Sequence, residues 1–136
     1  MGFIKRLFGS GKSKSDLIRD LAKHRISSSP LAISSGFTPE MVDSLSGMQI
    51  ASLPEAGIVA NVETYSTLKR AGTSDNEIFQ RIEAHRSRMV SGSMPAGCDL
   101  RSYIKYRVHL ENATGAPVSD ESIDFAIDEA LKFVGD

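Results

Sequence analysis

The stretch SDESIDFAIDEALKFV, residues 119–134, carries the clearest structural signal in the chain. Ser119 can accept a hydrogen bond from the backbone three residues further on, so it marks the start of a helix. Apolar residues then recur three and four positions apart, which places them on one side of that helix: Ile123, Ile127, Ala130, Leu131 and Val134. This stretch predicts an amphipathic helix that packs against other helices.

Capping residues followed by apolar stripes occur at several earlier places. They predict further helices at 15–26, 52–71, 74–89 and 99–111, with a shorter one from 38 to about 47. Ser52 with Glu55, and Ser74 with Glu77, have the spacing of a capping box. Residues 27–37 and 91–97 are rich in Ser, Pro and Gly, which favours connections. No bounded stretch alternates with the period of a strand. We therefore predict an all-α protein, a small irregular or orthogonal bundle of about five main helices.

Length and composition narrow the class of protein. A chain of 136 residues with 40% apolar and 24% charged residues is typical of one globular domain, here expected at residues 15–136. The single cysteine, Cys98, excludes an intramolecular disulfide and fits a reducing compartment. No apolar run reaches the length of a membrane span, and the N-terminus lacks the apolar core of a signal peptide. We expect a cytoplasmic protein.

The N-terminal segment differs from the rest in charge. The net charge is +5 up to Arg25 and −6 after it. On a helix, the stretch FIKRLF would place apolar residues on one side and two cations on the other: Phe3, Ile4, Leu7 and Phe8 against Lys5 and Arg6. We interpret residues 1–14 as a flexible, basic, amphipathic segment. It could dock on another protein or on an anionic membrane surface, pack on the body of the same chain, or remain disordered.

The motif GSGKSK at residues 9–14 resembles the end of a nucleotide-binding P-loop, but its context excludes that function. The P-loop pattern requires a glycine at position 6, where Arg6 stands, and a buried strand before it. The composition instead indicates a flexible hinge.

No other pattern indicates catalysis, a metal or a cofactor. His24, His85, His109 and Cys98 lack the spacings of metal ligands. Cys98 stands at the start of a predicted helix, whose dipole could lower its thiol pKa, but a small, partly buried cysteine is the commoner case. We therefore expect neither catalytic residues nor a cofactor.

The helices at 53–71 and 75–89 allow one alternative, a helix-turn-helix that binds DNA. Gly72 lies in the turn between them, and basic residues lie along the pair: Lys69, Arg70, Arg81, His85 and Arg88. The acidic body opposes binding to phosphates. The first hypothesis is thus a non-catalytic helical adaptor or regulatory domain that binds another protein, or the inner surface of a membrane, with residues 3–8 as the docking candidates. The second is a DNA-binding regulator.

Overall fold

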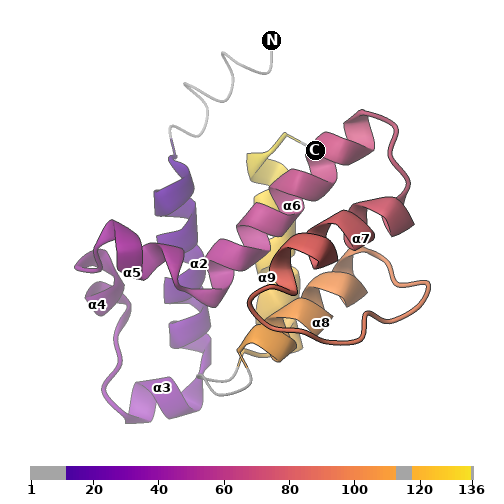
Figure 1. The fold of residues 1–136 in the computed structure, drawn as a ribbon. Helices are drawn as coiled ribbons and strands as arrows, with labels where there is room; N and C mark the ends of the chain where they lie inside the picture. The colour runs from indigo at the N-terminus through magenta and orange to yellow at the C-terminus, as the bar shows by residue number, and fades with distance from the viewer. Residues whose placement is uncertain (1–11, 113–117, 136) are drawn as a thin grey trace.

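The computed structural model describes residues 12–112 and 118–135. Within these residues it contains helices and no strand, which confirms the predicted all-α fold (Figure 1). The helices are α2 (Lys14–Ser28), α3 (Pro30–Ser34), α4 (Pro39–Asp43), α5 (Gly47–Ala51), α6 (Pro54–Arg70), α7 (Asp75–Arg86), α8 (Leu100–Glu111) and α9 (Asp120–Phe133).

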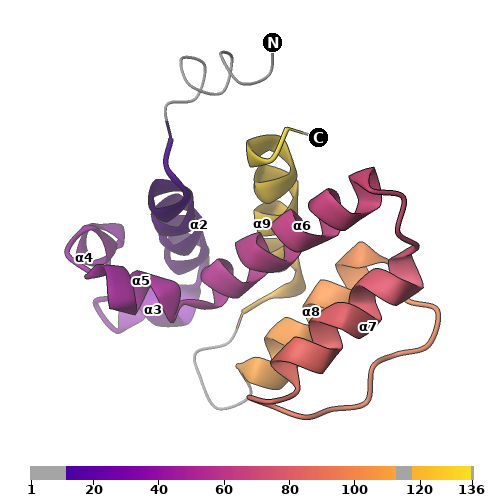
Figure 2. The same cartoon turned by 45° about the horizontal axis from the view of Figure 1, so that its top comes forward.

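Helix α6 runs through the middle of the molecule and contacts α2, α5, α7, α8 and α9. On one side of it lie α2 and the three short helices α3–α5, and on the other side lie α7 and α8 (Figure 1). Helix α9 packs behind α6 in that view. Figure 2 shows that α7 and α8 lie side by side and run in the same direction, because residues 87–99 lead the chain back along them. The C-terminal ends of α7 and α8 therefore lie together.

The stripe of α9 is buried as the sequence predicts. Ile123, Ile127 and Ala130 are fully buried, and they join one apolar cluster with side chains from α2 and from α4 to α8. Tyr103 of α8 lies in the same core and stacks on Phe79 of α7, with ring centroids 4.6 Å apart. The five long helices are those expected from apolar periodicity, so burial of one side of each helix determines this part of the fold.

The prediction for residues 27–47 was wrong in detail. Residues expected to be a connection include α3, the helix expected from 38 to about 47 is the shorter α4, and α5 follows where no helix was expected. Ser29 caps α3 by accepting from the Ala32 N–H at 3.3 Å. Ser46 and Gln49 form a reciprocal capping box at the start of α5. Ser29, in the stretch that suggested a break, thus begins a new, very short helix, and Ser46 begins another.

The capping box predicted at Ser52 and Glu55 was also wrong. The Ser52 hydroxyl donates to the Gln49 carbonyl at 2.7 Å, and α6 begins after Leu53 without a side-chain cap. Glu55 is buried and accepts from Arg25 of α2 at 2.5 Å. A long-range ion pair thus replaces the local cap.

Two further expectations concern α7. Ser74 caps it by accepting from the Glu77 N–H at 3.3 Å, although the Glu77 carboxylate accepts from Arg81 instead of reaching back. The helix was expected to extend to Met89 but ends at Arg86, and Met89 is 74% exposed. Its predicted inward position was therefore wrong.

Candidate docking surfaces

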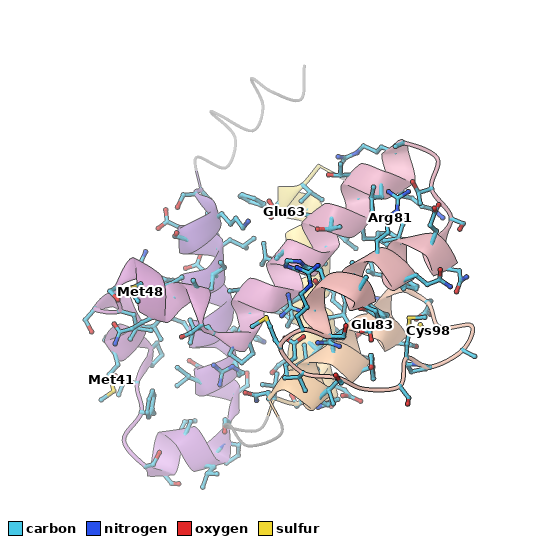
Figure 3. All side chains as sticks on the ribbon, viewed as in Figure 1. Met41, Met48, Glu63, Arg81, Glu83 and Cys98 are labelled. Carbon is cyan, nitrogen blue, oxygen red and sulfur yellow. The ribbon has the colours of Figure 1, made fainter. Side chains whose placement is uncertain are left out.

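An exposed apolar surface lies on the short helices. Seven large apolar side chains are exposed among the described residues, and five of them fall between positions 31 and 48. We call this set the α3–α5 face: Leu31, Ile33, Phe37, Met41 and Met48, with exposed fractions of 48–87%. Figure 3 shows Met41 and Met48 on one side of the molecule, away from Glu83 and Cys98 on the α7–α8 side.

The local sequence explains why these side chains are exposed. Residues 26–54 contain only two charged residues, Glu40 and Asp43. Each of the three helices has five residues, or about 7 Å of length, which is too short to cover a wide surface. Val42 and Ile50 are buried, whereas α3 buries no residue at all. The remaining apolar side chains consequently face solvent.

A groove of about 510 Å³ opens beside the α3–α5 face. We call it the α2–α4 groove. Its walls are mainly apolar and include Ala22, Ile26, Ala32, Val42, Leu45 and Leu53, together with Leu31, Phe37 and Met41 of the face itself. Its volume is within the range of sites that bind a compact apolar group. Leu31, Phe37 and Met41 thus belong to both the face and the groove.

Charges around this surface are mostly paired. Lys23 binds Asp43 at 2.6 Å, and Arg25 binds the buried Glu55. Glu40 is exposed and has no ion-pair partner among the described residues. The unpaired charge beside the face is therefore negative.

A second groove, of about 690 Å³, lies between the two sides of the molecule. We call it the central groove. It is lined by the start of α2, by α5 and α6, and by the C-terminal ends of α7 and α8. Small residues of α6, Ala56, Gly57 and Ala60, form part of its wall. A Cβ atom at Gly57 would lie 3.2 Å from the Arg86 guanidinium, so glycine permits this close approach.

Asn61 gives the central groove an unusual polar group. Its side chain lines the groove, and the residue is only 6% exposed. Its amide makes no hydrogen bond to any of the described residues. Asn61 is not among the described residues with fully buried, unpartnered side-chain atoms, which are Arg19 and Ser66, so its amide keeps contact with solvent in the groove.

An ion-pair cluster forms part of the wall of the central groove. Arg107 is 1% exposed and donates to Glu83 at 2.9 Å and through Nε to Glu111 at 2.8 Å. Arg86 also donates to Glu111, at 2.6 Å through Nε. The Tyr103 hydroxyl donates to Glu83 at 2.9 Å. Two arginines and two glutamates balance each other, so the cluster fastens α7 to α8 and leaves no carboxylate without a partner for acid–base chemistry.

The pKa of Glu111 gives a test of this cluster. Burial alone would raise the pKa, but hydrogen bonds from Arg86 and Arg107 outweigh burial and hold it below the ordinary value of 4.5. A carboxylate with a lowered folded-state pKa contributes stability that is present above the unfolded pKa and is lost as the pH falls through the folded pKa. We therefore expect the free energy of unfolding to fall as the pH is lowered from about 5 to 3.

Urea unfolding measures this free energy over the same pH range, for the original protein and for Glu111→Gln. The glutamine carries no charge at any pH, so the stability difference between the two proteins should shrink as the pH falls. Asp99 and Asp124, whose pKa values are also lowered, keep part of the pH dependence in both proteins. Two parallel curves would contradict the assignment.

The residues predicted for docking, Phe3, Ile4, Lys5, Arg6, Leu7 and Phe8, lie outside the described residues. The hypothesis that they dock on a protein or a membrane therefore remains a prediction. The hinge predicted at residues 9–14 is described only from Lys12 onward, and Lys14 already belongs to α2.

Three of the five basic residues proposed for DNA binding are engaged by the chain itself. Lys69 binds Asp75 at 2.6 Å, Arg81 binds Glu77 at 3.2 Å, and Arg70 donates to the Val134 carbonyl at 2.8 Å. Figure 3 shows Arg81 beside α6 and α7. The other two, His85 and Arg88, are exposed and have no ion pair to another described residue. Helices α6 and α7 do pack together through a turn in which Gly72 has φ +88°.

Cys98 is half-buried at the edge of the core. Burial raises its thiol pKa above the ordinary value, so the lowering by a helix dipole that the sequence allowed does not occur. The described residues contain no group of three or more His, Cys, Asp or Glu side chains placed to hold a metal ion. Among residues 12–112 and 118–135, no helix is both long and apolar enough to cross a membrane.

Neither apolar surface was predicted from the sequence. For the α3–α5 face a signal was present, since residues 26–54 combine few charges with eight serines and repeated large apolar residues. For the central groove no local signal exists, because its walls come from five separate helices.

Comparisons of the chain with protein-family models, with curated proteins and with solved structures gave no match, so its function must be argued from its own surfaces.

Proposed function

We propose that this protein is a non-catalytic cytoplasmic adaptor or regulatory domain that binds an amphipathic helix of another protein on its α3–α5 face. The observation that supports the proposal is the concentration of exposed large apolar side chains on that face. Contiguous apolar patches of this kind are typical of interaction sites in proteins that are otherwise polar outside. The buried charge cluster, in contrast, has no open group that could react with a substrate.

The shape and charge of the face specify its partner. The α2–α4 groove, with a volume of about 510 Å³, is suited to a row of side chains from one helix. Glu40 stands beside the face with no ion-pair partner among the described residues. The partner helix is therefore expected to present large apolar residues at positions i, i+3, i+4 and i+7, with a Lys or Arg next to them.

Site-specific photo-crosslinking in the source cell tests this function. A benzoylphenylalanine at Phe37, which is 55% exposed on the face, is compared with the same group at the exposed Gln80 of α7. We expect position 37, and not position 80, to crosslink one other protein. Peptide mapping should place the link in an amphipathic helix with a basic residue. Links to lipid, links to a second copy of this chain, or equal products at both positions would contradict the proposal.

The DNA-binding alternative remains a second proposal, supported by the packed pair α6–α7 and by the exposed His85 and Arg88. If it is correct, the protein binds duplex DNA with a strong salt dependence, and Arg81→Ala with Arg88→Ala weakens this binding. Fluorescence anisotropy with labelled DNA at low and high salt measures both effects. Binding that the double substitution leaves unchanged would exclude the α7 helix as the reading element.

A further inference from the structure

The central groove begins where the predicted amphipathic segment ends, and nothing in the proposed function uses this groove. We propose that residues 3–8, FIKRLF, occupy the central groove of the same chain. This inference goes beyond the proposed function, since it concerns a different surface and a partner that the chain itself carries.

The connection is long enough for this placement. Lys14 and Ser15, the first residues of α2, already line the groove, and Ile18 lines it one turn further on. Ser13 caps α2 and Lys12 pairs with Asp20 at 2.6 Å, so residues 9–11 form the free connection, which can span up to about 10 Å when extended. Two of them, Gly9 and Gly11, allow the chain to reverse direction. The segment can therefore turn back along the groove without any change in α2.

The groove matches the apolar side of the segment. Its walls include Ile18, Ile50, Leu53, Val90 and Val108. The small residues Ala56, Gly57 and Ala60 leave space opposite these walls for large side chains. On a helix, the segment would present its large apolar side chains on one side: Phe3, Ile4, Leu7 and Phe8. Burial of these four side chains provides the driving force.

Asn61 supplies the polar complement. Its amide has one acceptor oxygen and donor hydrogens, which match the N–H and C=O groups of a peptide backbone. It has no hydrogen-bond partner among the described residues, and its polar atoms remain accessible from the groove. A peptide in the groove would satisfy it, whereas a purely apolar occupant would leave it unpaired.

The charges are compatible with this occupant. The charged side chains that line the groove are already paired, Lys14 with Glu63 at 2.7 Å, and Arg86 and Arg107 with Glu111. On a helix, Lys5 and Arg6 would lie opposite the apolar residues of the segment and would remain in solvent. Docking in the groove hides the apolar residues that a membrane would bind, so the two forms of docking exclude each other.

A single tryptophan in the full chain tests the placement. The protein contains no tryptophan, so Phe8→Trp introduces a sole fluorescent reporter. We expect its emission to be shifted to the blue, and its quenching by acrylamide to be largely lost, relative to a synthetic peptide of residues 1–11 with the same substitution. Both properties should be independent of protein concentration.

Two groove variants in the Phe8→Trp background locate the site. Ala60→Arg places a large cation in the groove wall, and we expect it to restore acrylamide quenching. Thr64→Arg is the matched control, because Thr64 is exposed one turn further along α6 and does not line the groove. Asn61→Leu keeps the side-chain size but removes the amide, and we expect partial loss of protection. Circular dichroism confirms that each variant is folded.

The outcomes are distinct. The proposal is supported if the tryptophan is protected from acrylamide in the parent protein and in Thr64→Arg. Ala60→Arg and Asn61→Leu must then reduce this protection. A tryptophan as accessible as that of the free peptide overturns it. A blue shift that appears only with phosphatidylserine-containing vesicles assigns the segment to a membrane. A shift that grows with protein concentration assigns it to a second copy of the chain. None of these results depends on whether the α3–α5 face binds a partner.

Discussion

Replacement of Arg107 by alanine is expected to lower the free energy of unfolding by about 3–5 kcal/mol, because it removes one partner from a buried ion-pair cluster. Arg107 is 1% exposed and binds both Glu83 and Glu111. Without it, Glu83 retains only hydroxyl donors, those of Tyr103 and Tyr106. The desolvated Glu83 carboxylate then lacks a counter-charge and opposes folding, and α7 and α8 remain joined there only by the pair of Arg86 with Glu111.

Arg101→Ala is the matched control for this prediction. Arg101 also binds two carboxylates, those of Asp124 and Asp128, but its side chain is 42% exposed. Solvent-exposed pairs of this kind contribute at most about 1 kcal/mol. Urea unfolding followed by circular dichroism measures both variants. Equal losses for Arg107→Ala and Arg101→Ala would show that burial does not determine the contribution of the cluster.

The second large effect concerns binding. Met41→Glu on the α3–α5 face is expected to lower the affinity for the partner helix about tenfold to a hundredfold. The reason is that burial of one apolar side chain contributes about 1.5–3 kcal/mol. The introduced carboxylate would also be desolvated on binding. Since Met41 is 48% exposed in the free protein, the substitution is expected to leave the fold intact.

Met89→Glu separates a specific effect from a general one. Met89 is 74% exposed and lies outside the α3–α5 face. Met89→Glu therefore makes the same substitution at an exposed position away from that face. We expect it to retain the affinity of the original protein for the partner helix. A parallel loss in both variants would mean that added negative charge, rather than the apolar face, controls binding.

The long helices could be predicted from the sequence because each follows from local information. In α9, a serine cap and an apolar stripe suffice, and Ser119, Ile123 and Ile127 lie where they were expected. The short helices could not be predicted in the same way, since five residues carry too little periodicity. Glu55 shows a second limit: a residue placed like a capping acid is instead fixed by Arg25, thirty positions away in the chain.

The candidate surfaces show the same division. The amphipathic pattern of residues 3–8 is local and could be recognised, but the place where it docks depends on other parts of the chain. The central groove combines Lys14 with Asn61 and Arg107, which only the folded chain brings together. The exposure of Leu31, by contrast, was not predicted, because residues 27–37 were expected to be a connection.

The most direct test of the docking function is calorimetric titration of the helix identified by crosslinking at position 37. The helix is synthesised as a peptide and titrated into the full chain, into Met41→Glu and into Met89→Glu. We expect binding with a negative heat-capacity change, which is the signature of apolar burial. We also expect that Met41→Glu weakens the affinity at least about tenfold, while Met89→Glu does not. Undiminished binding by Met41→Glu would contradict the claim that the α3–α5 face is the docking site.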